Sequence, residues 1–326
     1  MSEMIVKTES WPIRGSFSIS RGTRTHVEVV VVELREANSI GRGECMPYAH
    51  YGESAVGVCA QIEGLRNDLA NGLERDGLQK LLPGGAARNA IDCALWDLEA
   101  KRTGKRVWQL AGIDAPVSLT SAYTLSLDTP EKMKEAASKN AHRPLLKLKL
   151  SGPGDFDRIV AVRAGAPEPR IIVDANEAWT SEIYQELAPK LISLGVEMIE
   201  QPLPAGRDGR LVEMARPISV CADESCHDRS SLREIIGKYD MINIKLDKTG
   251  GLTEALKLKA EAESAGLKIM VGCMVATSLA MAPAILLAQG ASVVDLDGPL
   301  LLNEDRLHGL KYDNSLVYPP ESNLWG

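Results

Sequence analysis

The chain has 326 residues, 44% of them hydrophobic and 25% charged, which is typical of a globular protein. Its formal net charge of −7 and its lack of basic runs argue against nucleic-acid binding. No apolar run approaches the roughly 18 residues of a membrane span, and the first residues lack the pattern of a secretory signal. Six cysteines without CxxC spacing complete the prediction of a cytoplasmic protein with free thiols, with neither a membrane nor a nucleic acid as partner.

The first third of the chain, residues 1–114, is predicted to be an α+β unit. Residues 3–34 alternate as strands do, and the run HVEVVVVEL is rich in β-branched residues. From about residue 53 to 103 apolar residues recur at helical spacing, and Gly104 is the expected stop. The sequence GRGE at residues 41–44 is a lone GxG that opens no βαβ unit, so we interpret it as a turn and not as a dinucleotide site.

From residue 115 onward, short apolar segments, most of them ending in a polar residue, alternate with helical stretches. The intervals between successive segment ends run from 22 to 27 residues. Eight near-equal strand–helix units predict an α/β fold, a (β/α)8 barrel of the TIM type over residues 115–304. The segments end at Thr124, Lys149, Asp174, Glu200, Asp223, Lys245, Gly272 and Asp297.

The second segment, LLKLK, places Lys147 and Lys149 on one face of a strand. Two such lysines usually decorate the solvated face of an exposed strand. Barrel strands are buried on both faces, however, and buried lysines are rarely unpaired. Because barrel enzymes carry their catalytic groups at the C-terminal ends of the strands, this pair favours a functional role.

Three consecutive segments end in an acid, at Asp174, Glu200 and Asp223. Each acid alone would be read as a helix N-cap at a strand-to-helix turn. Three carboxylates on adjacent strands would repel one another unless a cation joins them. Because the ligands are all oxygens, they favour a hard ion, with Mg²⁺ ahead of Mn²⁺ or Ca²⁺.

Lys149 and Lys245 end the second and sixth segments, which oppose each other in a ring of eight. Two amines facing each other across the barrel mouth suit the removal of a proton from one face of a carbon and its return to the other. A carboxylate on Mg²⁺ has an acidified α-proton, because the metal stabilises the enediolate. The base has to be an uncharged amine, and Lys147 together with the metal is predicted to favour the neutral form of Lys149.

The last segment carries Asp295 and Asp297, four strands away from Glu200. A molecule that spans this gap would have a carboxylate at the metal and a cation at the aspartates, and an α-amino group is the simplest such cation. The pattern therefore predicts a dipeptide substrate. The alternative is that one aspartate caps the following loop.

These motifs resemble a known family. The sequences KLK, VDAN, EQPLP, ADES and NIKLDKTGG resemble the muconate-lactonizing subgroup of the enolase superfamily, and DLDGPLLL and GECMPYAHYGES resemble the dipeptide epimerases within it. The resemblance covers essentially the whole chain. It implies that residues 1–114 cap the barrel, with residues 305–326 as a segment that could return to the cap.

The resemblance also implies roles. Lys149 and Lys245 would be the acid/base catalysts, acting on the L and D faces respectively, with Lys147 beside them. The acids Asp174, Glu200 and Asp223 would hold Mg²⁺, with Mn²⁺ as a substitute. The reaction would interconvert L-Ala-L-Glu and L-Ala-D-Glu by a 1,1-proton transfer in murein peptide metabolism, and a homo-oligomer is compatible with the family.

Two cap segments, SISRGTR and MPYAHYGES, are expected to set specificity. Arg24 is the first choice for pairing with a glutamate side chain of the substrate, and Arg21 is the alternative. Thr124 would hydrogen-bond the substrate or satisfy backbone groups.

Other readings stay open from the sequence. Within the same fold, o-succinylbenzoate synthase and muconate cycloisomerase use related lysines, although their substrates have no ammonium group for the aspartate pair. More remote are a Schiff-base lyase or aldolase with a nucleophilic lysine, and a barrel that binds without catalysis.

Overall fold

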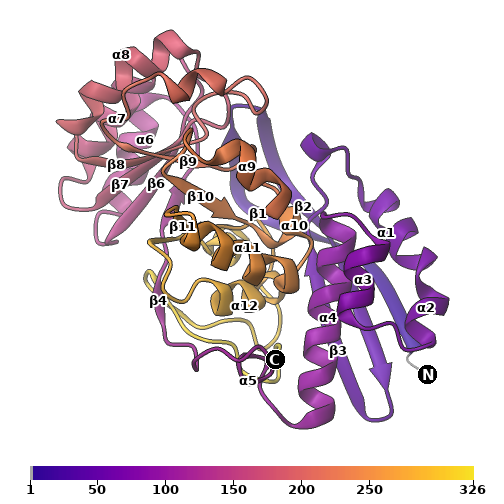
Figure 1. Cartoon of the computed structure of the whole chain (residues 1–326). Coiled ribbons are helices and arrows are strands. Elements are labelled where there is room, and N and C mark those ends of the chain that lie inside the picture. The colour runs from indigo at the N-terminus through magenta and orange to yellow at the C-terminus, as the bar shows by residue number, and fades with distance from the viewer. Residues whose placement is uncertain (1–2) are drawn as a thin grey trace.

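The structure is a computed structural model that describes residues 3–326. Its N-terminal part is an antiparallel sheet of β1 (Glu3–Ile19), β2 (Gly22–Glu36) and β3 (Ser39–Cys45), in that order. One face of the sheet is covered by helices, of which α4 (Ala86–Thr103) is the longest (Figure 1). The smaller helices of this part are η1 (Ala49–Tyr51), α1 (Ala55–Gly64), α2 (Arg66–Ala70), α3 (Arg75–Leu81) and α5 (Val107–Leu110).

Strand β2 is buried on both faces, which explains its unbroken run of valines. Val30 and Val32 point to the helices and join a core with Ile91 of α4. Val29 and Val31 point the other way and join the core of the rest of the molecule. Alternation along one strand therefore fixes the sheet as a layer between its own helices and the barrel.

The predicted turn at residues 41–44 is wrong, because these residues lie inside β3. The two glycines serve close packing. A Cβ atom on Gly41 would lie 2.2 Å from the carbonyl oxygen of Ala94, and one on Gly43 would lie 2.1 Å from that of Ala90. Only glycine lets the backbone of β3 approach α4 so closely.

The rest of the chain forms a parallel sheet of eight strands that curls into a barrel, which confirms the predicted α/β barrel fold. The backbone N–H of Ala122 donates a hydrogen bond of 2.8 Å to Val294 and so joins the two edges of the sheet. In sheet order the strands are β5 (Tyr123–Leu125), β6 (Leu145–Lys149), β7 (Arg170–Asp174), β8 (Val196–Glu200), β9 (Ser219–Ala222), β10 (Met241–Ile244), β11 (Lys268–Val271) and β12 (Val293–Val294).

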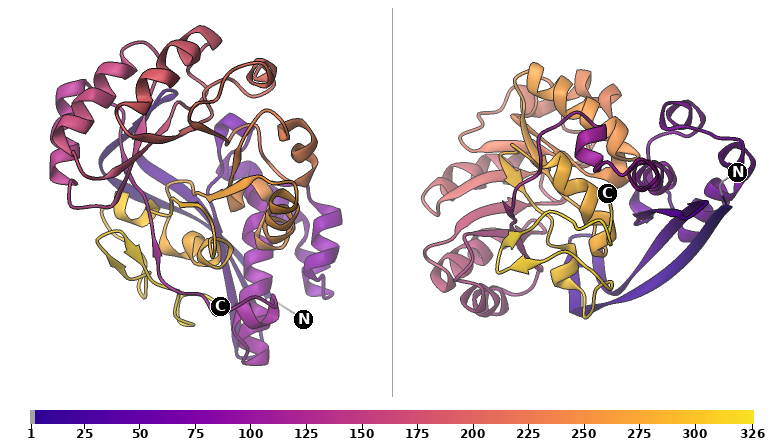
Figure 2. Two further views of the ribbon diagram at one scale, coloured as in Figure 1. Left: turned by 60° about the vertical axis from the view of Figure 1, so that its left-hand side comes forward. Right: turned by 90° about the horizontal axis from the view of Figure 1, so that it is seen from below.

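Helices surround this sheet, and the views of Figure 2 show them on its outer side. Two of the predicted strand–helix units are irregular. Only η2 (Gly209–Val212) lies between β8 and β9, and only η4 (Gly298–Leu301) directly follows β12. The other helices are α6 (Pro130–Lys139), α7 (Asp155–Gly165), α8 (Ser181–Ile192), η3 (Arg229–Ser231), α9 (Leu232–Ile235), α10 (Leu246–Thr249), α11 (Leu252–Ser264) and α12 (Ser278–Leu287).

The first predicted barrel strand is divided. Its beginning, β4 (Leu119–Thr120), pairs with β14 (Leu316–Val317), which in turn pairs with β13 (Tyr312–Asp313). Only its end, β5, belongs to the barrel. The C-terminal segment thus supplies a small separate sheet.

The barrel interior is layered. The layer nearer the N-terminal ends of the strands takes one apolar residue from each strand or its flank. These residues are Ala122, Leu145, Ile172, Met198, Cys221, Met241, Met270 and Val293. Two positions further along each strand the same face carries a layer that is mostly polar, because side chains alternate with a period of two. That layer consists of Thr124, Lys147, Asp174, Glu200, Asp223, Asn243, Gly272 and Asp295.

The end of the chain lies against α4 and α5 (Figure 1). The indole N–H of Trp325 donates to the carbonyl of Cys93 at 3.0 Å, and the backbone N–H of Gly326 donates to Asp97 at 2.7 Å. The division into residues 1–114, 115–304 and a returning segment 305–326 stays a prediction.

Across residues 3–326, no helix has both the length and the apolar character needed to cross a bilayer. The six cysteines are free thiols.

We predict that Gly43→Ala destabilises the fold by about 1–3 kcal/mol or more, because the added methyl group overlaps the backbone of α4. The midpoint of urea unfolding measures this change. Gly64→Ala is the matched control, since a Cβ atom there meets no atom within 4 Å. Equal midpoints for the two variants would contradict the close packing of β3 on α4.

Candidate active site

Three buried carboxylates converge at the C-terminal ends of adjacent strands. Asp174 and Glu200 end β7 and β8, and Asp223 directly follows β9. Each offers an oxygen, and these atoms all lie within 4.8 Å of one another. Burying three like charges is costly, so the site must supply positive charge.

Lys147 supplies part of that charge from the middle of the polar layer. Its Nζ atom lies 2.7 Å from Glu200 and 3.4 Å from Asp174. It also lies 2.8 Å from Asp295 on the other side. Burial lowers the pKa of Lys147, but the surrounding carboxylates, led by Asp295, raise it well above its ordinary value. Lys147 was predicted as a positive neighbour for Lys149, yet its charge is compensated by these three acids.

Lys149 and Lys245 come from opposite walls of the barrel. Their segments belong to β6 and β10, which are separated by β7, β8 and β9 in the sheet. Lys149 donates to Asp174 at 2.6 Å, and Lys245 donates to Asp223 at 2.7 Å. Both lysines line one cavity of about 180 Å³. The structure therefore brings the two predicted amines to the same space from strands four steps apart.

The nearby acids favour the charged form of Lys245, whereas a base has to be uncharged. Burial lowers the pKa of Lys245, but the nearby Asp223 and Glu200 raise it above its ordinary value. The carboxylates that keep this amine charged belong to the same triad that a cation would engage.

Sequence reasoning did not assign two residues that contact the triad, Lys248 and Asn243. The Nζ atom of Lys248 is fully buried and lies 2.6 Å from Asp223. The side-chain amide of Asn243 donates to Glu200 at 2.7 Å. Their places in the chain explain these contacts. Asn243 falls on the interior face of β10, and Lys248 lies on α10, which directly follows that strand.

The triad fits a hard divalent cation. Burial raises the pKa of Asp174, but Lys149 and Lys147 lower it to about 2, and Lys245 and Lys248 hold the pKa of Asp223 well below its usual range. Both acids are thus ionised at neutral pH. One oxygen of Glu200 is buried and accepts no hydrogen bond from the described residues, although Lys147 is near it. All-oxygen ligation of this kind suits Mg²⁺, with Mn²⁺ as the substitute.

Asp295 and Asp297 lie just after β12 and both line the cavity. The backbone N–H of Thr124 donates to Asp297 at 2.6 Å, and its hydroxyl lies 3.5 Å from Asp295. Burial, followed by the charge of Asp295, raises the pKa of Asp297 to about 7. The aspartates follow β12, which lies four strands from β8 in the sheet as expected, and Lys147 bridges the interior between Asp295 and Glu200.

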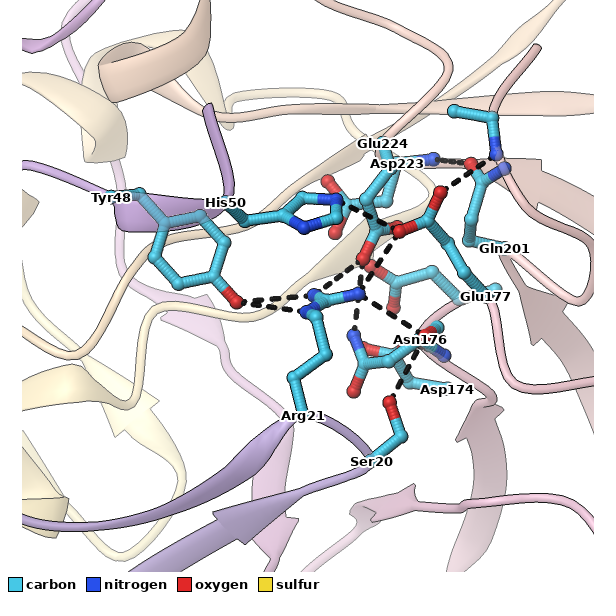
Figure 3. Close-up of polar contacts among 12 residues, drawn as sticks. Ser20, Arg21, Tyr48, His50, Asp174, Asn176, Glu177, Gln201, Asp223 and Glu224 are labelled. Atoms are coloured by element: carbon cyan, nitrogen blue, oxygen red, sulfur yellow. Dashed lines mark hydrogen bonds and ion pairs between the residues drawn. The ribbon is translucent and has the colours of Figure 1, made fainter. Parts of the chain in front are cut away.

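The two cap arginines differ in what they contact. Arg21 is held by acids and by Tyr48 (Figure 3). Arg24 lines the cavity, its guanidinium centre 5.4 Å from the ring centroid of Tyr48. No ion pair is found for Arg24 within residues 3–326.

Comparison with known proteins agrees with this geometry. Residues 1–112 match the mandelate racemase / muconate lactonizing enzyme N-terminal domain, and residues 130–320 match the enolase C-terminal domain-like family. The chain therefore belongs to the mandelate racemase and muconate lactonizing enzyme family of enolase-like proteins, which confirms the resemblance seen in its motifs.

Within this family, the chain is similar to proteins named as epimerases and racemases. The chain is 48% identical to the L-Ala-D/L-Glu epimerase of Escherichia coli, covering 94% of this chain and 96% of that one. It is 46% identical to an N-acetyl-D-glutamate racemase from a Pseudoalteromonas species, covering 91% and 95%. A solved enolase family member from Agrobacterium tumefaciens, with homology to dipeptide epimerases and with sodium and L-Ala-L-Glu bound, is 52% identical, with a TM-score of 0.98 over 100% of both chains. More distant dipeptide epimerases were solved with Mg and a dipeptide.

We predict that Mg²⁺ raises the thermal unfolding midpoint of the protein. A cation that binds only the folded triad stabilises it by about 2.7 kcal/mol at 100 times its dissociation constant. Glu200→Gln keeps the shape of the site but removes one anionic ligand, so its midpoint should respond less. The exposed Glu182→Gln on α8 is the control and should respond like the wild type. Thermal scans with Mg²⁺ and with EDTA make the comparison, and an equal response in all three proteins would rule out the triad as the metal site.

Proposed function

We propose that the protein is a Mg²⁺-dependent dipeptide epimerase that interconverts L-Ala-L-Glu and L-Ala-D-Glu. The observation that carries this proposal is the pair of buried lysines, Lys149 and Lys245, which line one cavity from strands four steps apart. An isomerase that inverts a carbon needs an acid and a base on opposite faces of it. Similarity to named epimerases and racemases over nearly the whole chain supports the same class.

The cavity offers a place for each part of such a dipeptide. The C-terminal carboxylate would lie at the cation held by Asp174, Glu200 and Asp223, which withdraws charge and so acidifies the α-proton. The N-terminal ammonium would lie at Asp295 and Asp297, which Thr124 orients.

Arg24 is the cation that we assign to the glutamate side chain. It lines the cavity and has no acidic partner within residues 3–326, whereas the guanidinium of Arg21 is occupied. The arrangement leaves Arg24 as the counter-charge at the cap end of the cavity.

The proton transfer itself is assigned to the two lysines. Lys149 would remove or return the proton on the L face of the α-carbon, and Lys245 would do so on the D face. Lys147 would keep the interior acids compensated and hold Asp295 in place at 2.8 Å.

A second candidate is racemisation of an N-acylated glutamate, favoured by the 46% identity to an N-acetyl-D-glutamate racemase. Such a substrate has the same reacting carbon and side chain but no ammonium group. The buried aspartate pair favours the dipeptide, because Lys147 pairs with Asp295, whereas no cation lies within ion-pair distance of Asp297 in residues 3–326 and an ammonium group would supply one. The same argument weighs against o-succinylbenzoate synthase and muconate cycloisomerase.

We further propose a cytoplasmic role in murein peptide metabolism, which is consistent with six free thiols. Association into a homo-oligomer is part of the proposal. Size-exclusion chromatography with light scattering tests the latter point.

The assigned faces predict two half-reactions in D₂O. Lys245→Ala should still exchange the α-proton of L-Ala-L-Glu through Lys149, yet form no D epimer. Lys149→Ala should exchange the α-proton of L-Ala-D-Glu only. Epimerisation should fall at least about 10²-fold in both, the usual size of a lost acid/base group. Proton NMR of both epimers with Mg²⁺ provides the readout.

Two results would refute this function. One is the absence of deuterium from the α-position with the wild type. The other is normal epimerisation by either lysine variant. Lys190→Ala, an exposed lysine on α8, is the matched control and should retain full activity.

The pKa of Asp297, raised to about 7, predicts a pH-dependent preference for the ammonium group. Above pH 7 this acid is ionised and attracts a cation, and below pH 7 it is protonated and does not. Between pH 8 and pH 6 the dissociation constant of L-Ala-L-Glu should therefore rise about fivefold relative to that of N-propionyl-L-glutamate, which lacks the ammonium. The loss of ionised Asp297 is about tenfold, and fuller protonation of the α-amino group, whose ordinary pKa is about 8, offsets about half of it.

Calorimetric titration of both ligands in the presence of Mg²⁺ gives this ratio. Effects of the lysines act on both ligands and cancel in it. Asp297→Asn should abolish the rise of this ratio between pH 8 and pH 6. A ratio that does not rise in the wild type would show that Asp297 does not recognise the ammonium.

A further inference from the structure

Arg21, on the turn between β1 and β2, is held from several sides (Figure 3). Its guanidinium donates to Glu224 at 2.7 Å and to Glu177 at 3.1 Å. It also donates to the backbone carbonyl of Asn176 at 3.1 Å and, from two nitrogens, to the hydroxyl of Tyr48 at 3.1 and 3.2 Å. These contacts use all three guanidinium nitrogens, so the group has little left to offer a substrate.

Glu224 depends on this contact. Its side chain is 1% exposed, and Arg21 is the one cation within ion-pair distance of it in the described part of the chain. Its second oxygen is buried and accepts no hydrogen bond among the described residues. Loss of Arg21 would leave a buried carboxylate without a counter-charge, which is strongly unfavourable.

The barrel loop after β7 is shaped to meet the cap. Asn176 and Glu177 adopt φ angles of 44° and 67°, a left-handed conformation that non-glycine residues rarely take. Asn176 thereby presents its carbonyl to the cap, where it accepts a hydrogen bond of 3.0 Å from the hydroxyl of Ser20 as well as one from Arg21. Strain at a site of this kind persists only where the surroundings hold it in place.

A second cap segment ends on the same loop. His50 of η1 lies with its Nε2 atom 2.9 Å from the Glu177 carboxylate (Figure 3). The other oxygen of Glu177 accepts from the backbone N–H of Ala205 at 2.7 Å. Both cap segments predicted to set specificity therefore contact one barrel loop.

We propose that Arg21 is a positioning residue, which latches the β1–β2 turn onto the barrel and does not bind the substrate. Its acidic partner Glu224 directly follows the ligand Asp223, and Asn176 lies two residues after Asp174, so the latch fixes the cap relative to the metal site. The latch also fixes Arg24, which lies three residues further along the chain at the start of β2. The assignment of Arg21 rests on the proposed function only in naming a dipeptide as the substrate of the cavity.

Four variants test the latch against a substrate-binding role: Arg21→Met, Glu224→Gln, the double variant, and Arg24→Met as the matched control three residues away in β2. Hydrogen–deuterium exchange of the peptide that spans residues 18–25 reports the turn without any need for activity. We expect exchange there to rise about tenfold in Arg21→Met. It should stay raised in the double variant, because the contacts of Arg21 with Asn176, Glu177 and Tyr48 are lost there as well. It should rise less in Glu224→Gln, which weakens one contact only, and it should stay unchanged in Arg24→Met.

The second readout is the ratio of kcat/KM for L-Ala-L-Glu to that for the uncharged L-Ala-L-Gln. A latch serves both substrates, so Arg21→Met should lower both values and keep their ratio. Arg24→Met should lower the value for L-Ala-L-Glu and collapse the ratio.

The proposal is overturned if Arg21→Met collapses the ratio, or if it leaves exchange of the turn at the wild-type rate. If the wild type epimerises neither dipeptide, the proposed function fails while the exchange data still decide whether Arg21 is a latch.

Discussion

The structure depends on one electrostatic constraint, which is that charges buried inside a barrel must compensate one another at short range. Two carboxylates of the triad, Asp174 and Glu200, surround the cation of Lys147 together with Asp295, in a layer that rests directly on an apolar layer. Lys149, Lys245 and Lys248 contribute further positive charge at the triad. Burying this many acids and amines is energetically possible only because they pair with one another. Removing one partner leaves the other buried and unpaired. The cluster is therefore both a structural unit and a reactive site.

Apolar packing and polar contacts together hold the cap on the barrel. Strand β2 gives one row of valines to its own helices and the other row to the barrel core, so apolar packing sets the distance between the layers. Polar contacts then set the register at the cavity mouth, where Arg21 and His50 engage Glu177. Packing and polar contacts thus divide the work, with the first supplying most of the buried area and the second placing the loops that cover the reacting carbon.

Much of this could be predicted from the sequence, because the barrel repeats. The spacing of the segments located the strands, and the alternation of side chains identified the acids and lysines at their ends. The elements that escaped prediction lack a periodic signal. Residues 41–44 look like a turn until α4 is seen to pack on them. The eighth segment was located by its spacing, but its strand was expected to carry Asp295 and Asp297, whereas β12 ends before them at Val294.

The partners of each charge also escaped prediction. Lys147 and Lys149 are equivalent by spacing, yet Lys147 contacts three acids and Lys149 contacts one. Arg21 and Arg24 lie three residues apart, and only the fold shows that Glu224 engages the first. Such choices depend on contacts between residues far apart in the chain, which no local pattern encodes.

The central claim is that two amines reach one carbon from opposite faces. A crystal structure with Mg²⁺ and L-Ala-L-Glu bound measures this directly. The account predicts that the Nζ atoms of Lys149 and Lys245 lie on opposite faces of the α-carbon of the glutamate, each about 3–3.5 Å from it. Both nitrogens on one face, or either one directed away from that carbon, would contradict it.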